Sequence, residues 1–309
     1  MKKIGILMLI AFLVLSVAGC GSNSTGQTGS QQAQSNSAFP VTIKDFMGRE
    51  FTIEKEPQRI VSMAPSNTEI LYELGLADKI VGVSDYDDYP PEVSQKPKMG
   101  GFSTPNIEAI AGAEPDVVLV DDGTFGKENA EKLEEMGIPV IITVPDSFDD
   151  IYTSYEMIGK ITGTQDKAEE IIKKIKDGIS SIQEKVKDRD RPKVYFAVSV
   201  GQSNYTAGKG TFIDAAINIA GGENVASDVE GWQDYSLEKL VEHNPDIIIA
   251  TNHAGDVDKL NEKPGYKETN AAKNGKIFVI DENIITRPTE RILEGINELA
   301  KIIHPEVFK

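Results

Sequence analysis

Two glycine-containing stretches come closest to known catalytic motifs, and neither completes one. Residues 208–211 read Gly-Lys-Gly-Thr, whereas a phosphate-binding loop requires Gly-x-x-x-x-Gly-Lys-Ser/Thr; here a glycine follows the lysine and the first glycine is missing. Residues 201–205 read Gly-Gln-Ser-Asn-Tyr and lack the last glycine of a Gly-x-Ser-x-Gly elbow. Acids are abundant enough for glycoside hydrolysis, but no pair is singled out. We therefore expect no catalytic residues and no enzyme, with an extracellular hydrolase as the remote alternative.

Metal-ligating residues are few and scattered. The histidines are His243, His253 and His304, and a Zn²⁺ or Mn²⁺ site requires histidines and carboxylates that cluster. His253 follows a predicted strand and is the one histidine expected near a cleft, whereas structural or solvated roles suit the other two. We expect no metal site and no cofactor.

Aromatic, amide and arginine side chains in predicted loops are better candidates for a binding site. Exposed aromatic residues in loops are better binding candidates than periodically spaced ones, which usually belong to the core, and loops at the C-terminal ends of strands line the ligand clefts of α/β folds. Trp232 is the strongest candidate, because the one tryptophan follows a glycine in a loop. The candidate ligand-binding residues are Ser66, Asn67, Tyr86, Phe102, Phe125, Tyr205, Trp232 and Arg287.

These loops must be positioned by strands and helices that alternate along the chain. Short apolar runs alternate with amphipathic stretches, a pattern typical of parallel sheets covered by helices. In the first half, a hairpin at 41–53 precedes strands at 60–63, 80–83, 117–120 and 140–144 and helices at 66–74, 130–136 and 151–161. In the second half, strands are predicted at 194–198, 247–250 and 277–280, and helices at 211–220 and 290–303.

One long amphipathic helix separates the two halves. Apolar residues recur at helical spacing from Ala168 to Val186, and charged residues fill the opposite face. Thr164 is a suitable N-cap, and Pro192 marks a point beyond the end of the helix. We expect a helix over residues 164–187 in an α/β fold of two Rossmann-like lobes with a ligand cleft between them. The predicted parts are the N-terminal lobe at 40–163, the helix segment at 164–190 and the C-terminal lobe at 191–309.

Both halves contain the same sequence pattern. Residues 106–120 and 236–250 each begin with a capping residue, continue with an apolar residue and a glutamate, and end in Pro-Asp followed by an apolar strand. The two glutamates, Glu108 and Glu238, are 238 − 108 = 130 residues apart. Each is expected in the first turn of a helix, where a negative charge complements the helix dipole. The repeat predicts two similar lobes that each present one glutamate.

The N-terminus has the features of an export signal. Lys2 and Lys3 precede an apolar run from Ile4 to Val17, which is shorter than the roughly 20 residues of a membrane-spanning helix. Residues 17–20, Val-Ala-Gly-Cys, resemble a bacterial lipobox, which implies removal of residues 1–19 and lipidation of Cys20. Residues 20–39 are rich in Gly, Ser, Gln and Asn and predict a flexible tether. We expect a lipid anchor on the extracytoplasmic face of the cell membrane.

The chain is strongly acidic. Its formal net charge is −17, and removal of residues 1–19, which takes away two lysines and no acid, gives −17 − 2 = −19. Such a surface repels nucleic-acid phosphates, so we exclude nucleic acid as a partner. Cys20 is the one cysteine, so no internal disulfide can form and the core alone must hold the fold. We expect a monomer.

The two lobes, the long helix and the lipobox together resemble the class III periplasmic binding proteins, which serve ABC importers of cobalamin, haem and iron siderophores. The resemblance covers about residues 40–309. It rests on Arg-Ile-Val-Ser at 59–62 before Asn-Thr-Glu at 67–69, on Gly-Val-Ser-Asp-Tyr at 82–86 with Tyr-Pro-Pro at 89–91, and on the two Pro-Asp patterns. The segments Ser-Asn-Thr-Glu and Asp-Tyr-Pro-Pro are most similar to the cobalamin-binding branch.

The resemblance implies a partner and roles for individual residues. The partner is the permease of an ABC importer with its ATPase, which receives a small corrinoid ligand from the binding protein. Glu108 and Glu238 match glutamates that dock into arginine pockets of the importer. The positions that match ligand contacts are Tyr86, Phe102, Tyr205 and Trp232, which would pack on a corrin, and Arg287, a pocket arginine.

Two departures from the family pattern keep other ligands open. Asp121-Asp122 replace an expected aromatic residue, for which Phe125 is the nearest substitute, and Asn283 replaces an expected acid. Haem and ferric siderophores are the alternative ligands. Haem would take Tyr86, Tyr205 or His253 as its axial ligand. Ferric catecholates need several cations, which Arg287, Arg291 and Lys209 supply and Asp85, Asp87, Asp121 and Asp122 oppose. Because the long helix would span both lobes, we expect only modest lobe motion.

Overall fold

The structure is a computed structural model that describes residues 39–121, 125–201 and 203–308. The predicted signal segment, Cys20 and all of the predicted tether except Phe39 lie outside these residues. Among the helices of the described part, none is both long enough and apolar enough to cross a bilayer. The described residues belong to one compact unit.

The described chain begins with the predicted hairpin. Strand β1 (Val41–Lys44) pairs antiparallel with β2 (Glu50–Ile53). Asp45 closes the turn, because its carboxylate accepts hydrogen bonds from the backbone N–H groups of Met47 at 3.0 Å and Arg49 at 2.9 Å. An aspartate that bonds the backbone two residues on is a common way to fix such a turn.

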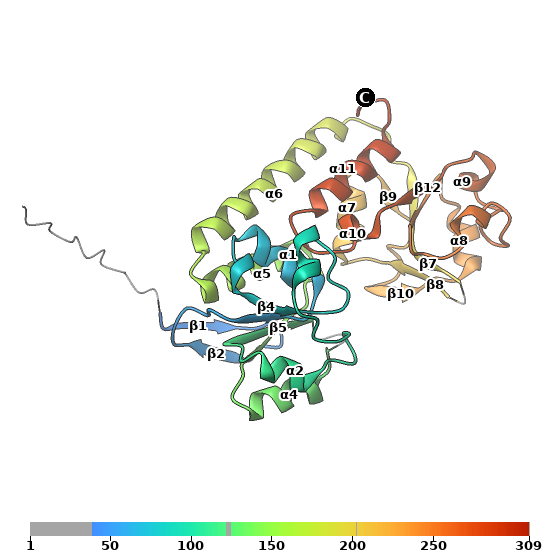
Figure 1. Ribbon diagram of the computed structural model, residues 1–309. Coiled ribbons are helices and arrows are strands. Elements are labelled where there is room, and N and C mark those ends of the chain that lie inside the picture. The colour runs from blue at the N-terminus through green and yellow to red at the C-terminus, as the bar shows by residue number, and fades with distance from the viewer. Residues whose placement is uncertain (1–38, 122–124, 202, 309) are drawn as a thin grey trace, which may run out of the picture. The chain divides into compact units, whose positions relative to one another are not determined.

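A four-stranded parallel sheet follows, in the order β4-β3-β5-β6. Its strands are almost wholly buried, as expected for a parallel sheet covered on both faces. Helices α1 and α5 cover one face, and α2 and α4 cover the other (Figure 1). The strands are β3 (Ile60–Ser62), β4 (Ile80–Val83), β5 (Val117–Asp121) and β6 (Val140–Thr143). The helices are α1 (Pro65–Glu73), α2 (Ile107–Gly112), α4 (Lys127–Glu135) and α5 (Phe148–Thr162), with 3₁₀ turns at Ala77–Lys79 and Pro91–Gln95.

The long helix is a single element, α6 (Gln165–Val186), within one residue of the predicted span at each end. Its buried stripe runs from Ala168 to Val186 and packs against α5 of the N-terminal half and α7 and α11 of the C-terminal half. Gly178 permits close packing, because a Cβ there would lie 2.8 Å from Leu293 Cδ2. The hydrophobic cluster along α6 contains strand residues of both sheets, so the two halves share one core.

The second sheet is mixed, which corrects the expectation of parallel sheets throughout. Its order is β10-β8-β7-β11-β12; β9, β11 and β12 run parallel to their partners, whereas β8 and β10 are antiparallel. The sequence analysis did not predict β8 and β10, because both strands are short and partly polar and therefore contain no apolar run. The strands are β7 (Lys193–Val200), β8 (Asn204–Ala207), β9 (Glu223–Asn224), β10 (Trp232–Asp234), β11 (Ile247–Thr251) and β12 (Ile277–Ile280).

Helices again cover both faces of this sheet. Helices α7 (Phe212–Ile219) and α11 (Ile292–Ile303) share the core along α6. Helix α8 (Leu237–His243) and α9 (Asn270–Lys273) pack on the opposite face with the tyrosines of a second cluster. A 3₁₀ turn at Val257–Lys259 and the short helix α10 (Glu282–Ile285) complete the described chain.

The sequence repeat is also a structural repeat. Asn106 caps α2 by accepting a hydrogen bond from the Ala109 N–H at 3.0 Å, and Ser236 caps α8 in the same way from Lys239 at 3.2 Å. Each copy then places a residue with positive φ before Pro-Asp, namely Glu114 at 47° and Asn244 at 49°. The aspartates Asp116 and Asp246 each hold the start of the neighbouring strand through a carboxylate contact of 3.0 Å to a backbone N–H. The two halves are therefore built on the same local plan.

Candidate functional site

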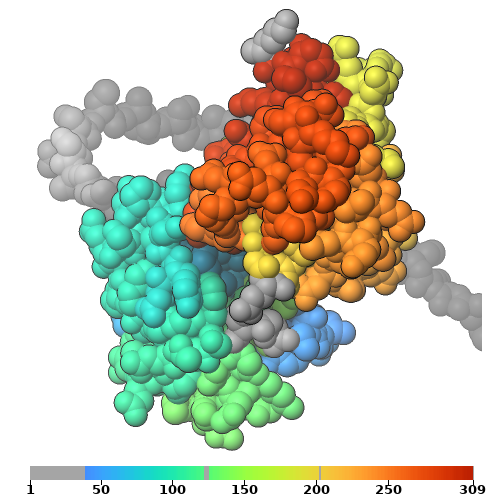
Figure 2. Space-filling view, turned by 90° about the vertical axis from the view of Figure 1, so that its right-hand side faces the viewer, coloured from blue at the N-terminus to red at the C-terminus, as the bar shows by residue number. Residues whose placement is uncertain are grey.

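A cavity of about 330 Å³ lies where loops of the two halves meet. It is bordered by segments that follow the C-terminal ends of β3 and β4, by Asp121 at the C-terminal end of β5, and by the segment that follows β12. In the sheet, β4 lies on one side of β3 and β5 lies on the other, so the strand order reverses at β3. The C-terminal ends of strands at such a reversal are where α/β sheets commonly bind ligands. In Figure 2 a furrow separates the two halves on this side. The lining residues are Ala64, Pro65, Ser66, Tyr86, Phe102, Asp121, Glu282, Asn283, Thr286, Arg287 and Pro288.

An aromatic pair forms one wall of the cavity. The rings of Tyr86 and Phe102 stack with centroids 4.3 Å apart and planes inclined by 28°. Tyr86 is 55% exposed, which is unusual for so large an apolar surface and leaves its ring available to a ligand. Lys98 holds the loop that carries Tyr86, because its Nζ donates hydrogen bonds to the carbonyls of Ser84 at 3.0 Å and Asp87 at 2.9 Å.

The buried side of the Tyr86 loop is held by Asp87. Its carboxylate accepts a short hydrogen bond from the Ser84 hydroxyl. Burial raises the pKa of Asp87, although the hydrogen bond from Ser84 acts in the opposite direction. Asp87 thus supports the loop from inside while Tyr86 faces outward.

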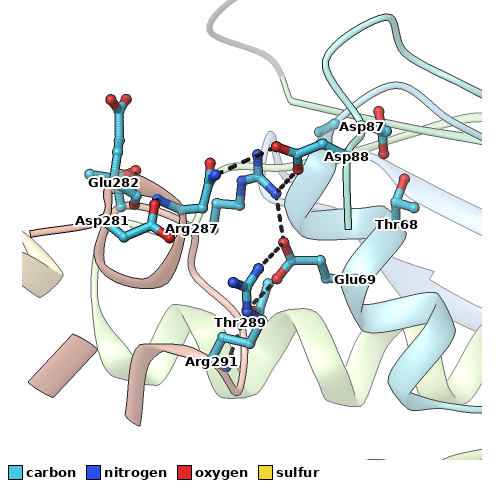
Figure 3. A network of polar contacts seen from close by, with 12 residues as sticks. Thr68, Glu69, Asp87, Asp88, Asp281, Glu282, Arg287, Thr289 and Arg291 are labelled. Carbon is cyan, nitrogen blue, oxygen red and sulfur yellow. Dashed lines mark hydrogen bonds and ion pairs between the residues drawn. The ribbon is translucent and has the colours of Figure 1, made fainter. Parts of the chain in front are cut away.

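Arg287 connects the cavity to a buried ion-pair network between the two halves (Figure 3). Its Nη1 donates to Glu69 Oε1 at 2.8 Å and to Asp88 Oδ1 at 2.7 Å. Glu69 also accepts from Thr289 Oγ1 at 2.9 Å and from Arg291 Nη1 at 3.0 Å. Burial lowers the pKa of Arg287, but the hydrogen bonds that it donates to Asp88 and Glu69 outweigh this effect, and the net pKa is raised.

A second buried contact lies one helical turn along α1. The Tyr155 hydroxyl donates to Glu73 and accepts a hydrogen bond from the Glu290 N–H at 2.8 Å. Burial raises the pKa of Glu73 to about 8, and the neighbouring carboxylates of Glu290 and Glu69 add to this effect. Glu69 and Glu73, spaced four residues apart, therefore face the same junction with the C-terminal half.

Four of the predicted ligand-binding residues line this cavity, namely Ser66, Tyr86, Phe102 and Arg287. Asn67 follows the lining residue Ser66 in the sequence, but it is buried. Its Oδ1 accepts a hydrogen bond from Thr143 Oγ1 at 3.0 Å. Phe125, just before α4, is 2% exposed and packs in the core under that helix, and its contact with a ligand stays a prediction.

Tyr205 and Trp232 do not border this cavity. They lie on β8 and β10 instead of in loops, and the Tyr205 hydroxyl donates to the Trp232 carbonyl at 3.2 Å. The indole packs edge-on against Phe212 with centroids 5.5 Å apart. A contact between these two residues and a ligand stays a prediction.

Sequence reasoning missed most of the ion-pair network. Glu69, Asp88 and Thr289 were not singled out, and Arg291 was counted as a cation of the cleft, whereas it stacks on Tyr89 at 3.8 Å and binds Glu69. The one available signal was the spacing of Arg287 and Arg291, which places two guanidinium groups close together. His253 lies at the margin, where its Nδ1 is 3.2 Å from the lining residue Glu282. Within the described residues, no three potential metal ligands cluster.

Comparisons with known proteins show the family of this chain. Residues 60–284 match the family described as periplasmic binding protein. An uncharacterised ABC transporter substrate-binding lipoprotein of Bacillus subtilis is 38% identical, with 100% of this chain and 99% of that protein covered. A cobalamin-binding protein of Halobacterium salinarum is 32% identical over 96% of this chain and 84% of its own length. The crystal structure of a possible iron-binding (periplasmic solute-binding) protein from Staphylococcus epidermidis is 33% identical, with a TM-score of 0.73 and coverage of 81% of this chain and 100% of that one.

The chain belongs to the periplasmic binding protein family. The matched region begins at β3 and ends in α10, so it contains both large sheets and α6, and the lining residues Thr286, Arg287 and Pro288 follow directly after it. Family membership confirms the predicted α/β class and places the chain among substrate-binding proteins of ABC transporters and not among enzymes.

Two exposed glutamates of this periplasmic binding protein occupy equivalent sites. Glu108 lies in the first turn of α2 and Glu238 in the first turn of α8. Both are exposed, and along the two 15-residue copies the degree of exposure differs only at the pairs Ala111/Val241 and Glu114/Asn244. The fold thus presents one such carboxylate from each half.

Proposed function

We propose that this chain captures a corrinoid in the cavity beside Arg287 and delivers it to the permease of an ABC importer. The observation that carries the proposal is the composition of the cavity wall. An exposed aromatic stack faces the same space as the amide of Asn283 and the hydroxyls of Ser66 and Thr286. A corrin has apolar ring edges and many carboxamides, which suit aromatic faces and uncharged hydrogen-bonding groups respectively.

The size of the cavity bears on how such a ligand would bind. A corrinoid is larger than about 330 Å³, so only part of it would enter the cavity. The remainder would extend along the furrow of Figure 2. Tyr205 and Trp232, on the C-terminal sheet, are the predicted contacts for that remainder. The cobalamin-binding relative from Halobacterium salinarum supports this ligand class.

A haem or ferric siderophore is the second candidate, favoured by the similarity to the possible iron-binding protein of Staphylococcus epidermidis. Against it stands the charge of the site. The one cationic side chain on the described lining is Arg287, and it is already paired with two carboxylates. A polyanionic ferric catecholate would lack the cations that it needs.

Calorimetric titration with cyanocobalamin tests the proposed ligand. Wild-type protein is expected to bind one equivalent, and Tyr86→Ala is expected to bind about tenfold more weakly because it removes one exposed aromatic contact. Met136→Ala is the matched control, since Met136 is 58% exposed at the end of α4 and away from the cavity lining. Absence of corrinoid binding together with tight binding of haemin or a ferric siderophore would replace this ligand by the second candidate.

Delivery is proposed to use Glu108 and Glu238, with the lipid on Cys20 holding the protein at the extracytoplasmic membrane face. Charge pairs at the rim of an interface orient the partner and raise the association rate. The double variant Glu108→Lys/Glu238→Lys should abolish stimulation of the importer's ATPase in proteoliposomes and leave corrinoid affinity unchanged. Glu135→Lys/Glu242→Lys changes the same charge at exposed positions of α4 and α8 and should retain stimulation. Equal loss in both double variants would refute specific docking.

A further inference from the structure

The network around Arg287 has a charge imbalance on its buried side. Two guanidinium groups, those of Arg287 and Arg291, share the single carboxylate of Glu69. All three side chains are largely covered, with exposures of 13%, 12% and 1%. The sum of their formal charges is 2 − 1 = +1. A buried charge without a counter-charge is costly, so the surplus must be balanced nearby.

Asp88 supplies the balancing charge from the solvent side. Its Oδ1 lies 2.7 Å from Arg287 Nη1, and its Oδ2 is 3.5 Å from Asn283 Nδ2, so it contacts two residues of the cavity wall. Unlike Glu69, Asp88 is 56% exposed. It belongs to the loop that also displays Tyr86. Figure 3 shows the guanidinium of Arg287 between the two carboxylates.

Arg287 still has donors to offer. Its two carboxylate contacts both use Nη1, and within the described part of the chain Nε and Nη2 make no hydrogen bond to protein. Since Arg287 lines the cavity, an acceptor on a ligand can reach the same guanidinium that Asp88 neutralises. Whether this acceptor is uncharged or negatively charged then decides how favourably the ligand binds beside Asp88.

We propose that Asp88 is a specificity-determining residue, which makes the cavity select ligands that present an uncharged acceptor to Arg287 over ligands that present a carboxylate or phosphate there. This inference rests on the proposed site. With Asp88 in place, the local charge is zero, and a second anion at Arg287 meets like-charge repulsion from a carboxylate on the same guanidinium. Glu282 also borders the cavity and adds to this repulsion. A carboxamide oxygen accepts the hydrogen bond without that cost.

The test compares ligands that differ by one charge. Cyanocobalamin and its b-, d- and e-monocarboxylates, in which one propionamide is hydrolysed, are titrated into wild-type protein, Asp88→Asn and Asp85→Asn. Asp85 is the matched control, because it is an exposed acid of the same loop that does not border the cavity. In Asp88→Asn the preference for the amide over at least one monocarboxylate should fall about tenfold, whereas Asp85→Asn should stay within about twofold of wild type.

Three results would overturn the role of Asp88. They are an unchanged preference in Asp88→Asn, an equal change in Asp85→Asn, and an equal loss of affinity for all four ligands. The last would mean that Asp88 only holds the two halves together.

The test remains informative where the proposed ligand is wrong. Failure of wild-type protein to bind cyanocobalamin refutes the corrinoid proposal alone. The same variants are then titrated with haemin and haemin dimethyl ester, which differ in the charge of two propionates. Asp88→Asn should shift the preference towards haemin, and no shift would refute the specificity role.

Discussion

The buried junction between the two halves and the wall of the cavity use the same chain segment in different ways. At the junction, Glu69 of α1 is buried and meets Thr289 and Arg291. The half-buried Glu73 is linked to the backbone of Glu290 through the Tyr155 hydroxyl. At the wall, a few residues earlier, Asn283 and Arg287 meet Asp88 and Tyr86 in contact with it. Arg287 belongs to both. The difference indicates that buried pairs fix the geometry of the halves, whereas the exposed pair sets the charge that a ligand meets at Arg287.

The largest effect is expected at the buried carboxylate. Glu69→Gln leaves Arg287 and Arg291 without their shared counter-charge, which should lower the free energy of unfolding by about 3–5 kcal/mol. Urea unfolding monitored by circular dichroism measures it. A loss below about 1 kcal/mol, the typical value for an exposed pair, would remove the distinction between junction and wall.

The second effect concerns pH. Glu73 has a pKa of about 8 in the folded protein and an ordinary value of 4.5, so the folded state binds more protons between these values. Stability should therefore fall as pH rises from 4.5 to 8, by at most about 1.4 kcal/mol per pH unit from this group. The substitution Glu73→Gln keeps the shape of the side chain and removes its ionisable carboxyl group.

The Glu73→Gln variant is compared with wild type by urea unfolding at pH 4, 6.5 and 9. It should match wild type at pH 4 and be more stable at pH 9. Parallel pH profiles for the two proteins would show that Glu73 ionises normally at the junction.

A smaller stability effect is expected at the wall. Asp88→Asn removes the exposed partner of the same arginine, but Arg287 borders the cavity, where water can replace that carboxylate, so the free energy of unfolding should change by about 0–1 kcal/mol. The melting temperature, measured beside Glu69→Gln, gives the ratio of the two effects. Equal destabilisation by both variants would contradict the view that Asp88 acts on ligand choice and Glu69 on structure.

The smallest change is expected in the separation of the halves. Because α6 is continuous and the core along it is shared, ligand binding should move the halves only slightly. Spin labels at Met136→Cys and Val241→Cys, two exposed positions of α4's end and α8, report this separation once Cys20 is replaced by serine. A swing of tens of degrees on addition of cyanocobalamin would contradict a rigid α6.

Sequence periodicity predicted the elements whose signal is local. Helix α6 and the strands of the first sheet follow directly from apolar spacing, and the repeat at 106–120 and 236–250 predicted equivalent caps. Strands β8 and β10 were missed because a partner strand, and not an apolar run, defines them. The Glu69–Arg287 pair joins residues 218 positions apart, and a glutamate on a helix is ordinarily expected in water. The burial of Phe125 could not be predicted, because a loop aromatic can turn inward under the next helix.

The position of the cobalt in a crystal of the protein with cyanocobalamin tests the central claim most directly. Anomalous scattering at the cobalt edge locates the metal independently of the protein coordinates. The account predicts one peak in the furrow, with the corrin edge against Tyr86 and Phe102 and a carboxamide oxygen on Arg287. A peak away from these residues, or none at saturating ligand, would contradict it.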